Sequence, residues 1–93
     1  MKEKETRKLR DLYSVGPATV RDFELLGITR VEQLVGRDAR KLYDRLCRLA
    51  GKRSDPCMMD VLSAAIAQAQ DPNLPKEKRK WWYWSQIRKS GKK

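Results

Sequence analysis

Apolar side chains recur along this chain every three to four residues, and glycine or proline separates the segments that carry them. That spacing is typical of amphipathic helices. One segment, from Met58 to Ala69, is apolar on more than one face, as expected of a central buried helix. We expect helices over 3–12, 17–26, 31–35, 39–50 and 56–70, and a short last helix around 81–87 after a linker at 71–75.

Helix signals at the sequence level support these boundaries. Pro17 suits the first position of a helix and Gly27 the position just after one. Thr29 followed three residues later by Glu32 forms a capping-box pattern. Asp55 before a proline is a typical helix start. The fourth helix runs from a cap at Asp38 to Gly51.

Alternation typical of strands does not occur over any length, and connections of two to six residues favour close packing. We therefore predict an all-α fold, a compact bundle of about five helices. Residues 1–75 form this helical domain. Residues 76–93 form a basic, Trp-rich segment that docks partly on it.

The charge of the chain changes this picture. The 93 residues carry a net charge of +10, with 22 Lys and Arg against 12 Asp and Glu. Residues 1–10 hold five basic and two acidic side chains, 11–75 hold nine of each, and 76–93 hold eight basic and one acidic. A neutral body with basic ends suggests an anionic partner, most often nucleic acid, although a charged end also serves solubility alone.

Several classes of protein are excluded or disfavoured. The chain has no histidine, so catalysis and metal binding through histidine are excluded. The scattered carboxylates, such as Asp55 and Asp60, have no accompanying base. No apolar run is long enough for a membrane span, and the charged start lacks the core of a signal peptide. We expect a cytoplasmic, non-enzymatic protein with no metal, no cofactor, no small-molecule substrate and no membrane partner.

The most informative stretch is 9–23, where two amphipathic segments flank a short hairpin. It resembles the helix-hairpin-helix motif, whose hairpin is apolar-Pro-Gly-apolar-Gly before a Pro-Ala-Thr-Ala-like helix start. Leu12, Val15, Gly16, Pro17, Ala18 and Thr19 match the motif. Tyr13 replaces the proline, Ser14 the first glycine and Val20 the last alanine.

A tight hairpin before a helix leaves backbone N–H groups pointing outward at the positive end of the helix dipole. Such a site holds a phosphate without reading base sequence. Gly16 keeps the approach open and suits a positive φ. The alternative is a structural corner between helices, with no ligand. Candidate nucleic-acid-binding residues are Ser14, Val15, Gly16, Pro17, Ala18, Thr19, Arg10, Arg21, Lys78, Arg79 and Lys80.

A wider resemblance rests on the segments 27–34, 42–47, 55–57 and 80–84. Together with the hairpin they are similar to the bacterial "pathogenicity locus" family, also described as mitomycin-resistance-like helix-hairpin-helix proteins, over about residues 6–85. The resemblance implies a five-helix domain with that topology, and DNA binding as the family expectation.

Two cysteines admit three interpretations. Cys57 lies at the start of a helix, where a thiol pKa falls, so it is the candidate for a reactive thiolate. Cys47 lies on the preceding helix, close enough in sequence for a redox-sensitive pair. Two buried small residues, or half of an intermolecular metal site, are the alternatives.

Three tryptophans, Trp81, Trp82 and Trp84, lie within four residues. On a helix Trp81 and Trp84 share a face, so not all three can pack on one surface. Two of them dock the segment onto the bundle in one interpretation. In the others they stack on bases, fill a partner's pocket, or form a homodimer seam.

The sequence thus predicts a small protein that binds nucleic acid, double-stranded DNA by preference, through backbone phosphates at the hairpin. The alternative is a protein-interaction module with a structural hairpin and the Trp segment as contact or dimer surface. A hairpin and basic segment on one face would favour the first.

Overall fold

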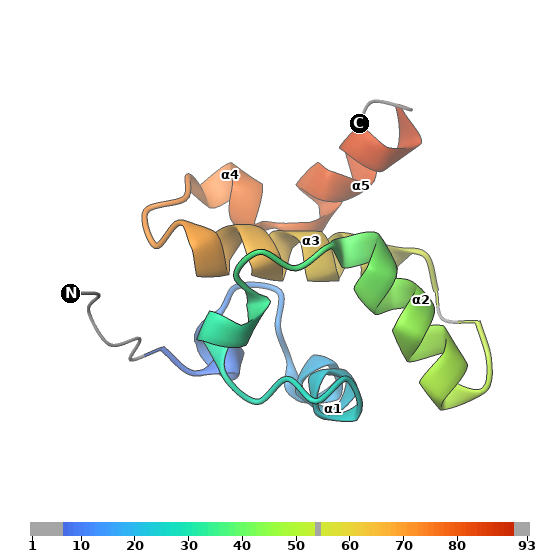
Figure 1. Ribbon diagram of the computed structural model, residues 1–93. Helices are drawn as coiled ribbons and strands as arrows, with labels where there is room; N and C mark the ends of the chain where they lie inside the picture. Colours follow the sequence, from blue (N-terminus) through green and yellow to red (C-terminus); the bar gives the residue numbers. More distant parts are fainter. Residues whose placement is uncertain (1–6, 54, 91–93) are drawn as a thin grey trace.

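The computed structural model describes residues 7–53 and 55–90, and the elements within these ranges are helical (Figure 1). They comprise α-helices α1, α2, α3, α4 and α5 and two single 3₁₀ turns, η1 and η2. Their bounds are η1 Leu9–Asp11, α1 Pro17–Leu25, η2 Val31–Leu34, α2 Ala39–Ala50, α3 Cys57–Gln70, α4 Lys76–Arg79 and α5 Trp81–Lys89. The predicted all-α class with about five helices is confirmed.

Helix α3 is the centre of the molecule. In Figure 1, α4 and α5 lie along one side of it, and α1 and α2 lie on the other. Leu62, Ala64 and Ala65 of α3 are fully buried, as the apolar character of its sequence predicts. The core around them is completed by Phe23 of α1, Leu34 of η2 and Leu46 of α2 among others.

Caps at both ends fix helix α2. The Asp38 carboxylate accepts a hydrogen bond from the Lys41 N–H at 3.1 Å. At the other end Gly51 adopts the left-handed conformation (φ 72°), and the Lys52 N–H donates to the Cys47 carbonyl. This is the glycine helix ending predicted for that position.

The expected first helix is wrong in its described part. Residues 1–6 lie outside the described residues, Lys8 is extended, and only the 3₁₀ turn η1 follows. The Asp11 side chain accepts the Lys8 N–H at 2.8 Å, a local bond that competes with continued helix. Leu9 and Leu12 are nevertheless both buried, because a 3₁₀ turn of three residues also places i and i+3 on one side.

Two further expectations need correction. The segment after Thr29 is the 3₁₀ turn η2 rather than an α-helix. The side chain that caps its N-terminus is Gln33 and not Glu32. The Gln33 side-chain oxygen accepts the N–H groups of Thr29 and Arg30 at 2.7 and 2.9 Å. The C-terminal segment forms two helices instead of one, because Lys80 is extended between α4 and α5.

Candidate nucleic-acid interface

The hairpin between η1 and α1 turns at Ser14. Ser14 has φ 73°, the one positive φ of a non-glycine residue in the described ranges. Gly16 is extended (φ −104°, ψ −175°), so the expectation of a positive φ at Gly16 is wrong. Serine thus adopts the left-handed conformation at the position where the predicted helix-hairpin-helix motif has its first glycine.

A buried glutamine holds the hairpin in place. Gln68 of α3 is 5% exposed. Its side-chain oxygen accepts the Tyr13 N–H at 2.7 Å, and its amide nitrogen donates to the Tyr13 carbonyl at 2.8 Å. One side chain thereby satisfies both backbone groups of a hairpin residue. Local sequence patterns do not indicate this contact, because it joins residues 55 positions apart.

The hairpin also contacts the C-terminal segment. The Ser14 hydroxyl donates to the Arg79 carbonyl and accepts from the Trp81 N–H, both at 3.3 Å. The rings of Tyr13 and Trp82 meet edge to face, with centroids 6.5 Å apart. The hairpin and the basic segment therefore adjoin.

The start of α1 offers backbone donors. Gly16 provides no side-chain cap, Pro17 has no N–H, and the first helical bond runs from the Val20 N–H to the Gly16 carbonyl. The N–H groups of Ala18 and Thr19 have no acceptor within the ranges that the structure covers. They lie at the positive end of the helix dipole.

A shallow pocket lies beside these donors. It encloses about 430 Å³ and is lined by Arg10, Val15, Gly16, Pro17 and Val20. A methyl group built on Gly16 meets nothing within 4 Å, so the approach from this side is open. Arg10, like Arg21 on α1, is exposed and carries charge near the site.

Two predicted hairpin residues have structural roles instead. The Val15 N–H donates to the Leu12 carbonyl and the Val15 side chain is 7% exposed, so neither faces a ligand. The Ser14 hydroxyl is engaged by the C-terminal segment. The hairpin surface consists of Gly16, Pro17, Ala18, Thr19 and Arg10.

The predicted basic residues of the C-terminal segment differ in availability. Lys78 is exposed. Arg79 is half-buried, and its Nε donates to the Leu74 carbonyl at 2.7 Å. Lys80 places its Nζ 5.4 Å from the ring centroid of Trp82. Arg79 and Lys80 thus both stabilise the segment itself.

The tryptophans divide in the same way. Trp81 and Trp84 are half-buried, and the Trp84 indole N–H donates to the Lys78 carbonyl at 2.7 Å. Trp82 is 45% exposed, and Tyr13 beside it is 49% exposed. Only Trp82 of the three presents a large ring surface to solvent.

An ion pair fastens α5 to α3. Asp60 is 2% exposed, and Arg88 binds it through two hydrogen bonds, Nε to Oδ1 at 2.9 Å and Nη2 to Oδ2 at 3.0 Å. This two-pronged geometry is the strongest form of such a pair. Asp60 is therefore a structural carboxylate.

The sequence predicts a lowered pKa for the Cys57 thiol, and this prediction is wrong. Hydrogen bonding to the Asp55 carboxylate, followed by burial, raises the pKa of the Cys57 thiol. The Asp55 carboxylate accepts the Cys57 N–H at 2.9 Å just before α3, but the N-cap of this helix is Pro56 and not the predicted Asp55. Cys47 and Cys57 are both half-buried and present as thiols.

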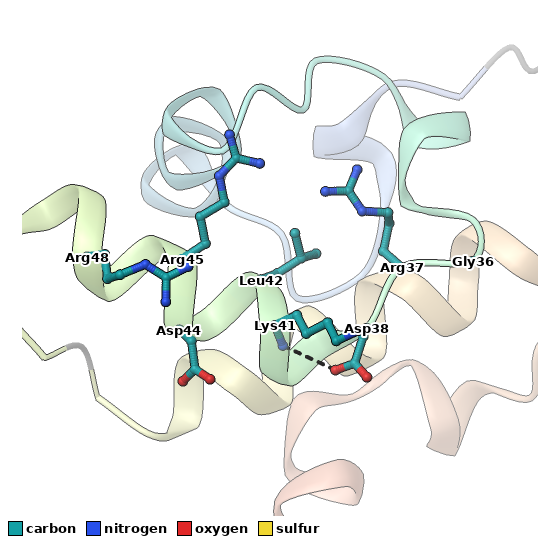
Figure 2. Close-up of a pocket in the computed structure, with 8 residues that line it drawn as sticks. All are labelled: Gly36, Arg37, Asp38, Lys41, Leu42, Asp44, Arg45 and Arg48. Carbon is teal, nitrogen blue, oxygen red and sulfur yellow. Dashed lines mark hydrogen bonds between the residues drawn. The ribbon is translucent and has the colours of Figure 1, made fainter.

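The structure also reveals a basic surface that the charge sums concealed. Residues 37–53 carry seven Lys or Arg and two Asp. A pocket of about 460 Å³ on α2 is lined by four of these cations together with both aspartates (Figure 2). A charge sum over a window the length of one helix would have found it. The α2 basic surface consists of Arg37, Lys41, Arg45, Arg48, Lys52 and Arg53.

Two kinds of feature are absent from the described residues, namely a metal-binding cluster and a membrane-spanning helix. Among the residues described, no three His, Cys, Asp or Glu side chains gather in a way that could hold a metal ion. Over the same residues, no helix has the length and apolar character needed to cross a membrane.

Comparison with known proteins identifies the family. The model of the pathogenicity locus family matches residues 2–90. The chain is 41% identical over 81 residues to the mitomycin resistance protein McrB of Streptomyces lavendulae, covering 87% of this chain and 73% of that protein. No solved structure matches. This chain therefore belongs to the pathogenicity locus family.

Proposed function

We propose that this protein is a cytoplasmic, non-enzymatic nucleic-acid-binding protein that holds the phosphate backbone of double-stranded DNA without reading base sequence. The observation that carries the proposal is the open start of α1. There the N–H groups of Ala18 and Thr19 lack acceptors among the described residues, and Arg10 lines the adjoining pocket. Backbone donors at a helix start are a recurrent phosphate site.

The neighbouring basic segment supports the proposal. Ser14 joins the hairpin to Arg79 and Trp81. The exposed Lys78 directly precedes Arg79 in the chain and therefore lies near the hairpin. Phosphate contacts of this kind supply most of the affinity in sequence-independent binding. The helix-hairpin-helix assignment itself stays a prediction, because the described chain before the hairpin contains only the single turn η1.

The test is binding to a labelled random-sequence duplex across a salt series. Gly16→Glu places an anion where the phosphate would lie, in a position with open space around it. Leu25→Glu is the matched control, since Leu25 is 53% exposed at the other end of the same helix. Gly16→Ala keeps the charge and adds only a methyl group.

We expect wild type, Leu25→Glu and Gly16→Ala to bind with a steep salt dependence. Gly16→Glu should lose about tenfold in affinity, because about one phosphate contact is lost at 0.1 M salt. If Gly16→Glu and Leu25→Glu bind equally well, the hairpin is a structural corner. If the wild type does not bind at physiological salt, the DNA proposal fails.

One observation favours a second candidate, a protein-interaction module. The exposed rings of Tyr13 and Trp82 form a small apolar patch beside the hairpin. Exposed aromatic residues are enriched in protein interfaces. Sedimentation at increasing concentration, wild type beside Trp82→Ala, tests its homodimer form: association that the substitution abolishes would support it.

A further inference from the structure

Helix α2 carries cations on one side of its axis and the core on the other. Leu42 and Leu46 are 3% and 1% exposed against the bundle. Arg45 and Arg48, at i and i+3, share the outer side. All six members of the α2 basic surface are exposed.

These cations have no anionic partners among the described residues. No ion pair joins any of them to a carboxylate in that part of the chain. The Asp38 carboxylate is used to cap α2 through the Lys41 N–H. A surface that serves solubility mixes both signs of charge, and here one sign dominates.

Positive and negative side chains that line the first pocket also point in different directions. Figure 2 shows the guanidinium groups of Arg37 and Arg45 on one side of Leu42, and the carboxylates of Asp38 and Asp44 pointing to the opposite side. The guanidinium groups of Arg37 and Arg45 thus point away from the two aspartates that line the same pocket.

The basic surface continues past this pocket. A second hollow of about 570 Å³ shares Asp44 and Arg48 with the first and extends to Lys52 and Arg53. The twelve residues of α2 span about 18 Å at 1.5 Å per residue. A DNA duplex presents about ten phosphate charges over that length.

We propose that the α2 basic surface is a second binding site for the phosphate backbone of nucleic acid, separate from the hairpin surface. The proposal rests on the nucleic-acid binding proposed above and extends it to a second contact. Four of the six cations are arginines, whose planar guanidinium matches phosphate oxygens in pairs. An anionic membrane fits less well, because Leu42 and Leu46 on the apolar side of α2 are buried and Leu49 is the one large apolar side chain of this helix that is strongly exposed.

The test compares two double variants with equal change in charge. Arg45→Gln with Arg48→Gln removes two cations from the α2 basic surface. Arg30→Gln with Arg40→Gln removes two exposed cations that line neither pocket. Binding to the random duplex is measured across a salt series for both, beside wild type and Gly16→Glu, with thermal unfolding to verify the fold.

We expect the Arg45/Arg48 variant to lose about tenfold in affinity for each phosphate contact removed at 0.1 M salt, with a salt slope shallower by about 1 to 2. The Arg30/Arg40 variant should change much less. Equal effects of the two variants would overturn the second site while leaving the hairpin proposal intact.

The remaining outcomes separate the two proposals. Loss in the Arg45/Arg48 variant, with Gly16→Glu unaffected, would uphold the α2 site and overturn the hairpin site. No binding by wild type would overturn both. Binding to vesicles of anionic lipid is measured in addition. Binding to vesicles that is lost in the Arg45/Arg48 variant, without binding to DNA, would also overturn the inference.

Discussion

The α2 basic surface and the C-terminal segment are both rich in Lys and Arg, but their cations serve the protein differently. In the C-terminal segment Arg88 binds Asp60, Arg79 binds the Leu74 carbonyl and Lys80 lies over Trp82. The cations of the α2 basic surface are exposed and form no ion pairs with described carboxylates, although Arg37 donates to the Gln33 carbonyl at 3.5 Å.

The difference shows that a charge sum over a segment does not measure the charge available to a ligand. The C-terminal segment is the most basic stretch of the sequence, yet three of its cations stabilise the fold. The neutral sum over residues 11–75 hid the α2 basic surface, whose cations form no ion pairs with described carboxylates. Substitutions in the two regions should therefore have opposite consequences for stability and for binding.

The largest expected effect is on stability. Arg88→Ala leaves the Asp60 carboxylate buried without its cation. We expect a loss of about 2–3 kcal/mol in the free energy of unfolding, below the roughly 3–5 kcal/mol of a fully buried pair because the Arg88 side chain is 32% exposed. Chemical denaturation monitored by circular dichroism measures the loss.

Arg48→Ala is the matched control from α2, and we expect it to change stability by less than about 0.5 kcal/mol. Asp60→Asn, which removes the buried charge itself, should cost less than Arg88→Ala. A similar loss for Arg48 and Arg88 would contradict the distinction between the two regions.

The second prediction concerns a substitution that removes the contacts between the hairpin and α3. Gln68→Ala leaves the Tyr13 N–H and carbonyl without their partner, which should cost about 1–3 kcal/mol. Hydrogen exchange at the Tyr13 amide should accelerate more than exchange in α2. Gln70→Ala is the control, since Gln70 is an exposed residue of the same helix that accepts one N–H, from Gly36. Equal costs would show that burial of Gln68 adds nothing.

The third prediction concerns the left-handed turn. Ser14→Ala loses the hydroxyl contacts and keeps a side chain at φ 73°, whereas Ser14→Gly loses the contacts and relieves the conformation. We expect Ser14→Ala to be less stable than Ser14→Gly by about 1 kcal/mol. Thermal unfolding of both variants tests this, and an alanine variant as stable as the glycine variant would contradict the assigned turn.

The smallest effect lies at the start of α3. The Cys57 N–H, followed by its thiol, lowers the pKa of the Asp55 carboxyl, while Asp55 raises the pKa of the Cys57 thiol. Asp55→Asn should therefore speed the alkylation of Cys57 at mildly alkaline pH. Because the Asp55 pKa is lower in the folded protein than in the unfolded chain, its contribution to stability is present at neutral pH and is lost as the pH falls through the folded pKa.

Both measurements use a Cys47→Ser background as the parent protein, so that one thiol reacts. The difference in unfolding free energy between this parent and its Asp55→Asn variant should shrink in acid, because the Asp55 carboxyl is then protonated and uncharged. Chemical denaturation of both proteins at neutral pH and in strong acid measures that difference. Faster alkylation in the parent than in the Asp55→Asn variant would restore the interpretation of Cys57 as an activated thiol.

Most of the fold follows from local patterns in the sequence. The apolar run of α3, the cap at Asp38 and the glycine at the end of α2 each specify structure within a few residues. The 3₁₀ turns η1 and η2 escaped prediction because i and i+3 apolar spacing fits three residues per turn as well as about 3.6. In each turn a side chain, Asp11 or Gln33, then bonds the backbone locally.

The candidate site was harder to predict because its parts are distant in sequence. The sequence pattern located the turn before α1. Gly16 and Pro17 also explain why the N-terminus of α1 has no side-chain cap. The role of Gln68, the engagement of Ser14 and the use of Arg88 depend on contacts with partners 28 to 67 positions away. The α2 basic surface was present in the composition of residues 37–53 but lost in a longer sum.

Ser14 also ties the timing of synthesis to the shape of the hairpin. Its bonding partner Trp81 lies 67 positions later. At a translation rate of about 5–20 residues per second, the two emerge roughly 3 to 13 s apart. Throughout that interval Ser14 is without the bond to Trp81 that it makes in the finished protein. The hairpin is thus among the first parts of the chain to be made and among the last to be completed.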